Sequence, residues 1–539
     1  MLVPRSLGIL APFFLAAAAT AQSNQPSPGV WLLDPVLSTD AKLIESDGSQ
    51  VRSYRLPTRP GLVSYIGHDG NLIRAQNTGT NGPGFGGGIQ RVASDGTILW
   101  NYVPQLSGTS HHDIEELPNG NVLMVVTDPF TTAEFAALGR DPSTMTLRPV
   151  VLSERIIEVE QTGPNTGRIV WEWRAADHLV QQDSPGMSNF GSVRGEPGKI
   201  HINWPPGEIE QLWIHMNSID YNAELDQIVV SSRTFSELWI IDHSTTTAEA
   251  AGSTGGRSGR GGELLYRWGN PTAHFANGTR QLNEQHDVNW IPPGYPGAGN
   301  LICFNNRKGN LVGLGNASAI TEMTPPPTDA NGNYPQPTGA NSFAPFSLVW
   351  EYFDPRPTSL FSAFMSSAQR LPNGNTLVCS SFQNRVFELG ANDAIVAQRT
   401  ANMSYKALHY PRSFSADSEQ VSAINGGSAQ FSLDAEPTFA NHSYAVLGSV
   451  NGTFPGATLF GVHIPLRIDW YTTVATGSPT LPNSIGRLDA NGRATAGFFL
   501  PAGAARDFVG LQMHHAFLVF DNNGMPVHAS NALPLRLTQ

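Results

Sequence analysis

The sequence predicts an all-β fold, with a six-bladed β-propeller followed by a smaller C-terminal β-sandwich. The chain of 539 residues contains 54 glycines and 40 prolines, which favour turns and short strands over long helices. Strand-like runs alternate with turn residues, and few stretches have the period of an amphipathic helix. Similar units recur along the chain, and several of them close on a strand that contains tryptophan.

Six units of strands and turns can be followed in the first three quarters of the chain. They cover residues 31–55, 61–103, 109–174, 213–268, 284–352 and 361–400. Most are roughly 40 to 70 residues long with about four strands each, which is the size of a propeller blade. Two units contain a Leu-Pro-Asn-Gly-Asn turn, at residues 117–121 and 371–375. A string of β-sandwiches is the alternative all-β architecture, but it does not explain the repeated closing tryptophan.

The pattern changes after residue 412. Residues 413–539 lack the Leu-Pro-Asn-Gly turns and the tryptophan-rich closing strands, although strand-like runs continue at residues 429–433 and 494–500. Short strands with regular turns are typical of a β-sandwich. We therefore expect a catalytic propeller over residues 22–412 and a separate sandwich-like domain over residues 413–539.

Residues 1–21 have the features of a secretory signal peptide. Arg5 supplies the positive charge, residues 7–19 form an apolar run, and Ala19-Thr20-Ala21 provides a small-x-small cleavage site. The apolar run is too short for a membrane anchor, which needs about 18 residues. The sequence therefore predicts a secreted or periplasmic protein, cleaved after Ala21 and without a membrane span.

The formal net charge of −12 argues against nucleic acid or an anionic membrane as a partner. An anionic small molecule would need a local basic pocket to bind against this field. The chain has two cysteines, Cys303 and Cys379, at matching places in two strand patterns. An exported protein can hold them as a disulfide or as two free thiols, and the sequence leaves both states open.

Histidines stand at matching places in three units. They are His111 or His112 in the third unit, His215 in the fourth and His286 in the fifth. If the first strand of each unit lines a central channel, these histidines face one axis. A single histidine more often fills a polar slot in the core, but three equivalent positions favour a site. Three imidazoles at one point can attack a substrate and donate protons, or they can bind zinc, copper or iron.

Two arginines also have matching positions. Arg233 and Arg307 each end the strand that follows a histidine strand. A guanidinium group presents a planar fork of donors that suits the oxygens of sulfate or phosphate. Two such groups would repel a divalent cation, and Asp113 and Asp287 should point away from their neighbouring histidines because strand side chains alternate. The sequence therefore predicts a site for a tetrahedral oxyanion and no metal.

At these residues the chain resembles the bacterial arylsulfate sulfotransferases, the type that needs no nucleotide sulfate donor. The matching segments are residues 111–121, 215–219 with 231–233, 285–287 with 305–307, and 371–375. The resemblance covers about residues 30–412 and depends most on the order of the histidines and the Ser-Ser-Arg segment. It implies a propeller that moves a sulfuryl group from an aryl sulfate to a phenolic acceptor by a ping-pong route, with no cofactor.

The resemblance also implies a role for individual side chains. One histidine is transiently sulfurylated, the others assist, and an arginine binds the sulfuryl oxygens. The resemblance implies that His286 is the sulfurylated histidine, that His215 with His111 or His112 assists, and that Arg233 binds the sulfuryl oxygens. The spacing to His215 favours His111, whereas the match of residues 112–118 to residues 286–292 favours His112.

Three further residues are expected to bind substrate. The internal repeat adds Arg307, and Asn217 and Asn305 lie in the same motifs as the histidines and arginines. Two other classes of function remain open. A non-catalytic propeller that binds carbohydrate or protein would have its histidines scattered outside the channel, and a metal-dependent propeller enzyme would contain stoichiometric metal when purified.

Overall fold

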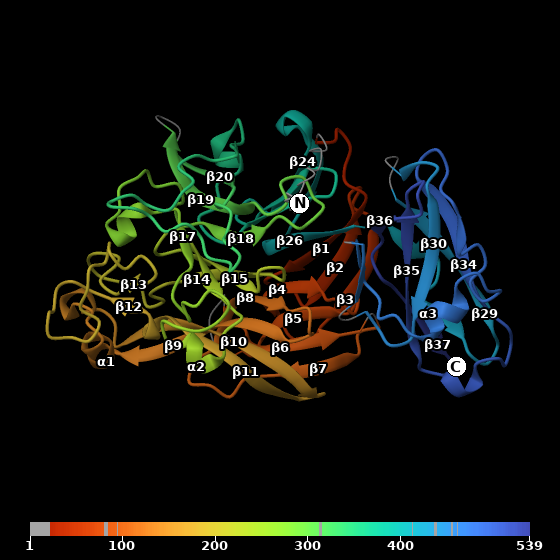
Figure 1. The fold of residues 1–539 in the computed structure, drawn as a ribbon, viewed down its shortest axis with the longest axis horizontal. Coiled ribbons are helices and arrows are strands. Elements are labelled where there is room, and N and C mark those ends of the chain that lie inside the picture. Colours follow the sequence, from red (N-terminus) through yellow and green to blue (C-terminus); the bar gives the residue numbers. More distant parts are fainter. Residues whose placement is uncertain are drawn as a thin grey trace, which may run out of the picture.

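The protein is described by a computed structural model that covers residues 22–79, 85–93, 95–311, 315–411, 413–435, 439–453, 456–460 and 462–539. The expected signal peptide, residues 1–21, lies outside these residues. The described chain is all-β, as predicted (Figure 1). Its α-helices are short and comprise α1 (Thr132–Ala137), α2 (Thr247–Ala250) and α3 (Trp470–Ala475). No helix in the described ranges is long and apolar enough to cross a membrane.

Six four-stranded antiparallel sheets form the described chain up to residue 411. The first sheet contains β1 (Gly29–Pro35), β2 (Asp40–Glu45), β3 (Gln50–Arg55) and β26 (Ser404–Pro411). The second contains β4 (Pro60–Ile66), β5 (Leu72–Asn77), β6 (Gly87–Val92) and β7 (Ile98–Tyr102). The third contains β8 (Ser110–Glu116), β9 (Val122–Thr131), β10 (Val150–Gly163) and β11 (Thr166–Arg174). The fourth sheet contains β14 (Met216–Asn222), β15 (Gln227–Ser232), β16 (Glu237–Asp242) and β17 (Tyr266–Trp268). The fifth contains β18 (His286–Trp290), β19 (Leu301–Leu311), β20 (Gly315–Met323) and β21 (Trp350–Tyr352). The sixth contains β22 (Ser367–Arg370), β23 (Thr376–Ser380), β24 (Arg385–Leu389) and β25 (Ile395–Thr400). A small parallel pair, β12 (Leu179–Val180) and β13 (Ile200–His201), lies in a connection.

One terminal strand of each sheet contacts its counterparts in the neighbouring sheets, and these inner strands form a closed cycle of β4, β8, β14, β18, β22 and β26. The predicted units after residue 60 correspond to one sheet each. The first unit supplies only three strands, and β26 completes its sheet by pairing with β1, where Leu32 lies opposite Leu408. The ring is therefore closed by two strands from its opposite ends.

The two Leu-Pro-Asn-Gly-Asn segments form hairpin turns between inner strands and their neighbours. In the turn between β8 and β9, Gly120 N–H donates to the Leu117 carbonyl at 2.8 Å. In the turn between β22 and β23, Gly374 N–H donates to the Leu371 carbonyl at 3.0 Å. Both glycines are left-handed, with φ of 82° and 83°, a conformation that glycine adopts without a steric penalty.

The tryptophans of the closing strands connect neighbouring sheets, as expected for packing residues. Trp100 is fully buried, and its indole N–H donates to the Thr166 carbonyl of the next sheet at 3.1 Å. Trp173 donates in the same way to the Gly262 carbonyl at 2.7 Å. A buried indole needs such a partner for its N–H. Trp100 and Trp173 are therefore packing contacts between neighbouring units of the ring.

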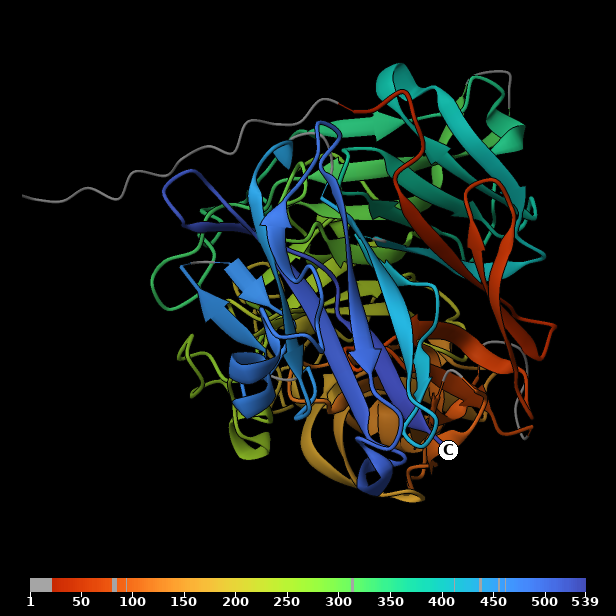
Figure 2. The same cartoon turned by 90° about the vertical axis from the view of Figure 1, so that its right-hand side faces the viewer.

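The C-terminal strands form a separate group beside β1–β3 (Figures 1 and 2). One sheet contains β27 (Phe414–Ala416), β29 (Gly427–Asp434) and β34 (Arg493–Leu500). A larger one contains β28 (Gln420–Ser422), β37 (Leu533–Thr538), β35 (Gln512–Phe520), β30 (Ser443–Ser449), β33 (Ile485–Arg487) and β36 (Pro526–Ala529), and a hairpin contains β31 (Ala457–Leu459) and β32 (Val462–Ile464). An ion pair of 2.6 Å between Arg52 and Glu419 connects this group to the ring.

Cys303 and Cys379 are buried in β19 and β23, and both are free thiols. Burial raises the pKa of the Cys379 thiol to about 12. A thiol protonated at neutral pH is a poor nucleophile, so the two cysteines are inert packing residues.

Candidate active site

Several residues near the starts of inner strands have a left-handed backbone, and His112, His215 and Asp287 are among them. The φ angles of His112, His215 and Asp287 are 59°, 58° and 57°. Each lies beside a register shift between an inner strand and its neighbour. Left-handed backbone is costly for residues other than glycine and asparagine, and it concentrates at functional sites. These irregularities break the alternation of side chains at the point where the inner strands meet.

Three histidines come together at the centre of the ring of six sheets, where the inner strands meet. One ring nitrogen from each of His112, His215 and His286 lies within 4.8 Å of the others. The ring centroids are 4.9 Å apart for His112 and His215, and 6.4 Å apart for His215 and His286. His111 lies behind this group, with its Nδ1 2.8 Å from the Nδ1 of His112 and its Nε2 3.7 Å from Glu154. Of the two histidines in the first motif, His112 is therefore the one that faces the group.

Burial keeps these imidazoles neutral. It lowers the pKa of His286 to about 3, with further contributions from the charges of His215 and Arg233. Burial and the charge of His215 likewise lower the pKa of His111 to about 3. The pKa of His112 is also held well below its usual value, first by burial and then by its histidine neighbours. A neutral imidazole has a lone pair available for attack or metal binding.

These neutral histidines predict a loss of stability in acid. An unfolded imidazole takes up a proton near pH 6.5, whereas His111 in the folded protein does so only near pH 3, so the free energy of unfolding decreases as the pH falls from 6.5 towards 3. At pH 5 each such histidine should destabilise the fold by about 2 kcal/mol relative to pH 7. Urea unfolding at both pH values measures this, and His111→Asn should reduce the difference by that amount. An unchanged difference in the variant would contradict the prediction.

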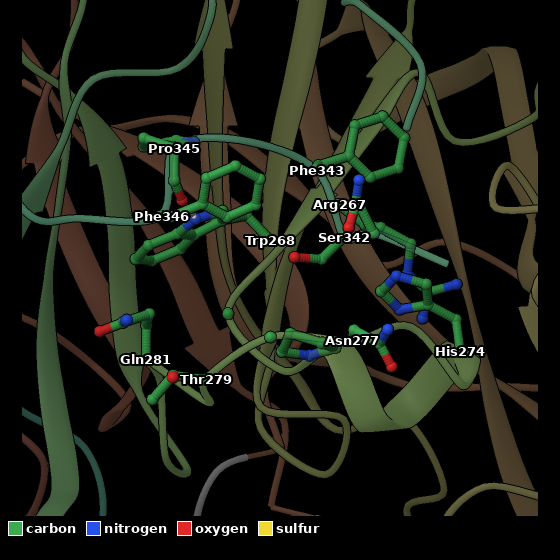
Figure 3. Close-up of a pocket in the computed structure, with 14 residues that line it drawn as sticks. Arg267, Trp268, His274, Asn277, Thr279, Gln281, Ser342, Phe343, Pro345 and Phe346 are labelled. Carbon is green, nitrogen blue, oxygen red and sulfur yellow. Dashed lines mark hydrogen bonds between the residues drawn. The ribbon is translucent and has the colours of Figure 1, made fainter. Parts of the chain in front are cut away.

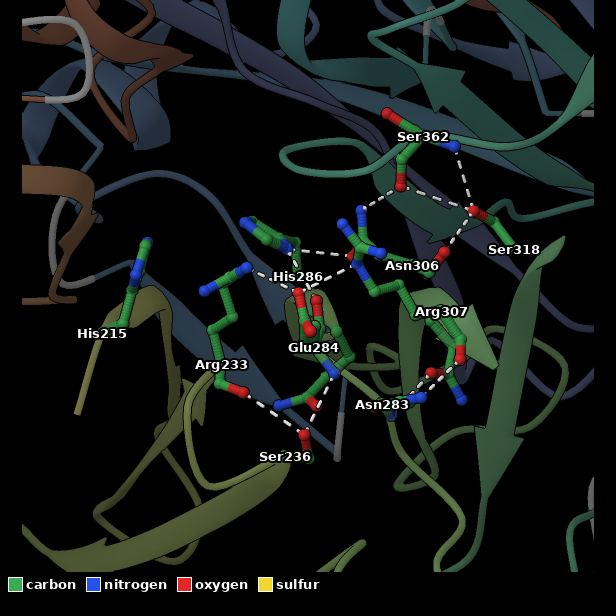
Figure 4. A network of polar contacts seen from close by, with 12 residues as sticks. His215, Arg233, Ser236, Asn283, Glu284, His286, Asn306, Arg307, Ser318 and Ser362 are labelled. Atoms are coloured by element: carbon green, nitrogen blue, oxygen red, sulfur yellow. Dashed lines mark hydrogen bonds and ion pairs between the residues drawn. The ribbon is translucent and has the colours of Figure 1, made fainter. Parts of the chain in front are cut away.

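The hydrogen bonds of Asn306 determine the tautomer of His286 (Figure 4). The Asn306 amide nitrogen donates to the carbonyls of Ser362 and Met365, both at 2.9 Å, so its Oδ1 must be the atom 2.9 Å from His286 Nδ1. The Glu284 carbonyl also lies 3.1 Å from this nitrogen. Because both neighbours of Nδ1 are acceptors, Nδ1 must carry the proton. The lone pair of His286 is therefore on Nε2.

The two arginines meet at one carboxylate (Figure 4). Oε2 of Glu284 lies 2.5 Å from Nη2 of Arg233 and 3.0 Å from Nε of Arg307. Arg233 also contacts Glu210 at 3.2 Å. Its backbone N–H donates to the His215 carbonyl at 3.0 Å, which ties it to the histidine group. The predicted oxyanion donors thus lie together, and a side chain of the protein contacts both.

The two predicted asparagines differ in placement. Asn217 is fully buried, and its amide donates to the Gln285 carbonyl at 2.8 Å, while its Oδ1 has no hydrogen-bond partner among the described residues. Asn305 bonds to the backbone of Gln281 and Asn283, at 2.8 and 2.9 Å, and so holds a loop instead of facing the histidines. Its neighbour Asn306 is the residue that reaches His286.

The prediction that Asp113 and Asp287 point away from the site was wrong. Both carboxylates pair with the Nζ of Lys406 at 2.7 Å, although they come from sheets that are not neighbours. Because the two sheets are not neighbours, the carboxylates can meet only at the centre of the ring of sheets. The left-handed residues His112 and Asp287 interrupt the alternation that would otherwise turn these side chains away. Lys406 is 7% exposed, and despite its burial the two aspartates raise its pKa well above the usual value.

This ionic group and Tyr405 were missed by the sequence reasoning. Tyr405 precedes the lysine on β26, and its ring centroid lies 6.4 Å from that of His112 and 6.2 Å from that of His286. Its hydroxyl donates to the Asn217 carbonyl. β26 lies outside the repeated units, so no internal match pointed to it.

The three histidines could also hold a metal ion. Imidazole nitrogens are preferred ligands of zinc, copper and iron, and a partner on the second ring nitrogen, such as Asn306 provides for His286, is common at metal sites. The two arginines oppose a cation less than their number suggests, since Glu284 and Glu210 offset their charges.

A cavity of about 350 Å³ lies apart from these residues, between η3 (Pro271–His274) and the segment 341–346 (Figure 3). Trp268 and Phe346 line it, together with Arg267. The Arg267 guanidinium is already paired with Glu237 at 2.5 Å. The cavity contains none of the predicted site residues.

Comparison with known proteins identifies the family. No curated protein matches the chain. Solved structures with similarity to the chain include an inactive virginiamycin B lyase from Staphylococcus aureus with quinupristin, at 12% identity, TM-score 0.32, and coverage of 76% of this chain and 93% of that one. A second is a putative 6-phosphogluconolactonase from Bacteroides uniformis, at 11% identity, TM-score 0.35, and coverage of 70% and 84%. The sequence profile described as Arylsulfotransferase (ASST) matches residues 90–410. The chain therefore belongs to the arylsulfotransferase (ASST) family.

Proposed function

We propose that the protein is an exported arylsulfate sulfotransferase that works through a sulfohistidine intermediate. The ring over residues 22–412 is a six-bladed β-propeller that carries the reaction, and residues 413–539 form a β-sandwich. Residues 1–21 direct the chain to the periplasm or the outside of the cell. The family membership supports aryl sulfotransfer, and the six sheets with a closed cycle of inner strands support the propeller.

In the first half of the reaction, the Nε2 lone pair of His286 forms a bond to the sulfur of the aryl sulfate, and the bond from sulfur to the phenolic oxygen breaks. Arg233 and Arg307 bind the sulfuryl oxygens. The N–H group of His112 stabilises the departing phenolate, which takes a proton from solvent as it leaves, and His215 faces the phenolic oxygen with its unprotonated nitrogen.

In the second half, an acceptor phenol replaces the first. His215 accepts the hydroxyl proton as the oxygen attacks sulfur, and the bond from sulfur to His286 breaks. The side chain of His215 is 19% exposed, so it can return this proton to water. His286 is then neutral again with its lone pair on Nε2.

The observation that carries this proposal is the orientation of His286. His286 is a buried neutral imidazole with its proton held on Nδ1 and its lone pair on Nε2, and it lies beside two other histidines and near Arg233. The most direct test is incubation with a chromogenic aryl sulfate, with and without added phenol. Phenol-dependent release of the chromophore supports transfer, release independent of phenol indicates hydrolysis, and no release contradicts the proposal.

Asn306 should be needed for turnover. Asn306→Ala removes the acceptor that holds the Nδ1 proton, and kcat should fall by about 10- to 100-fold, as when other functional histidines lose their orienting partner. The KM for the donor should change little, because the arginines remain. Asn306→Asp retains an acceptor and should keep more activity than Asn306→Ala. Equal activity of Asn306→Ala and the unaltered protein would contradict this role.

A metal-dependent enzyme is the second candidate, because three histidine nitrogens converge. Metal analysis of the purified protein separates the two. Stoichiometric zinc, copper or iron that is lost together with activity on chelation would favour the metal enzyme, whereas activity unaffected by a chelator would favour the sulfohistidine route.

A further inference from the structure

The position between the two arginines is already filled by an anion of the protein. We propose that the Glu284 carboxylate occupies the place of the sulfuryl group, so that a donor must displace it, and that this exchange selects esters with a single negative charge. This inference rests on the proposed function for the identity of the natural ligand. The occupied anion position itself can be tested without any transfer activity.

The contacts of Glu284 are those that an anionic ligand would make. Its Oε2 lies 2.5 Å from Arg233 and 3.0 Å from Arg307, as a ligand oxygen between two guanidinium groups would. Arg233 directly follows β15, whereas Arg307 lies within β19 and does not end that strand as predicted. Glu284 lies in the segment that enters β18. The carboxylate is therefore at the point where the two predicted oxyanion donors converge.

The backbone of Glu284 is held by hydrogen bonds, whereas its carboxylate is partly exposed and, among the described residues, is held only by the two arginines. The residue is left-handed, with φ of 53°, which is uncommon for glutamate. Its N–H donates to the Ser236 hydroxyl at 3.1 Å, and its carbonyl lies 3.1 Å from His286 Nδ1. Its side chain is 29% exposed, so rotation about its bonds can carry the carboxylate into solvent without moving the backbone that holds His286.

Displacement of the Glu284 carboxylate by the donor explains why the site selects esters with a single negative charge. An aryl sulfate brings one negative charge, the same as the carboxylate that it displaces, so the balance with Arg233 and Arg307 is unchanged. A phosphate monoester carries nearly two charges at neutral pH, and it would add a charge close to the displaced carboxylate and to Glu210. Glu284 therefore makes the site unfavourable for phosphate esters while it leaves sulfate esters able to bind.

The test uses the full chain and two probes that cannot transfer a sulfuryl group, an arylsulfonate with one charge and an aryl phosphate with two. Dissociation constants are measured by calorimetry for the unaltered protein and for Glu284→Gln. We expect the variant to bind the arylsulfonate about 5- to 10-fold more tightly, because a partly exposed ion pair no longer competes. The gain for the aryl phosphate should be larger. Glu160→Gln, which removes the same charge from an exposed pair with Arg168, should change neither constant.

Equal or weaker arylsulfonate binding in Glu284→Gln would overturn the inference, provided that the variant unfolds at the same urea concentration as the unaltered protein. Glu284→Asp shortens the side chain and so moves the charge away from the arginines without removing it. Its dissociation constant for the arylsulfonate should lie between those of the unaltered protein and Glu284→Gln. Tighter arylsulfonate binding in a protein that transfers no sulfuryl group would support the anion position and contradict the proposed function. Sulfuryl transfer by the unaltered protein, together with unchanged arylsulfonate binding in Glu284→Gln, would support the proposed function and contradict the anion position.

Discussion

His286→Ala should abolish transfer of a sulfuryl group from an aryl sulfate to a phenol, with a loss of at least about 10⁴-fold, because removal of a covalent nucleophile costs more than removal of an assisting group. The fold should remain intact, since alanine leaves the Asn306 amide bonded to the Ser362 and Met365 carbonyls. Initial rates with a chromogenic donor and a phenol measure the effect. The unaltered protein, incubated with donor alone, should gain the mass of one sulfuryl group on the peptide that contains residue 286.

A matched control is His442→Ala, a half-buried histidine in the C-terminal part of the chain. It should retain full activity. Substantial transfer by His286→Ala, or a sulfuryl group found on His112 or His215 instead, would show that the nucleophile has been assigned to the wrong histidine.

Lys406→Met should lower the free energy of unfolding of the ring by about 3–5 kcal/mol, which is the cost of breaking a buried ion pair by removal of one partner. The substitution fills similar space, but it leaves the carboxylates of Asp113 and Asp287 facing each other without a cation. Urea unfolding followed by tryptophan fluorescence reports on the ring, which contains the buried Trp100 and Trp173. The same change at the exposed Lys42 should have no effect.

A triple variant separates the charge from the packing. Combining Lys406→Met with Asp113→Asn and Asp287→Asn removes all three charges, so it should recover part of the lost stability. A triple variant that is less stable than Lys406→Met would show that the aspartates stabilise the ring through other contacts. The N–H groups of Ile219 and Ala368, which donate to these carboxylates at 3.1 and 3.0 Å, are the first candidates for such contacts.

Local signals in the sequence account for most of the ring. The Pro-Asn-Gly turns at residues 117–121 and 371–375 form hairpins because glycine supplies the left-handed position that each turn requires. Repetition of the units then locates the sheets. The sequence did not indicate that β26 completes the first sheet, because pairing between the two ends of a ring leaves no pattern within either segment.

The site was predictable to the extent that its residues repeat. The histidines recur at the start of inner strands, so their convergence follows from the repeat. The direction of the neighbouring side chains does not, because the left-handed residues His112 and Asp287 override the alternation on which the prediction depended. The same applies to Asn306, since the register of β19 and β20 shifts after Asn305 and the faces of the strand cannot be assigned from sequence.

The pairing of β26 with β1 has a consequence for biogenesis. A chain that crosses a membrane or leaves the ribosome with its N-terminus first exposes β1–β3 long before residues 404–411 arrive to cover the edge of β1. The same late segment carries Tyr405 and Lys406, which complete the wall and the charge balance of the site. A nascent chain therefore remains both open-edged and inactive until this segment has emerged, and truncation before it would yield an aggregation-prone product with no reactive histidine cluster.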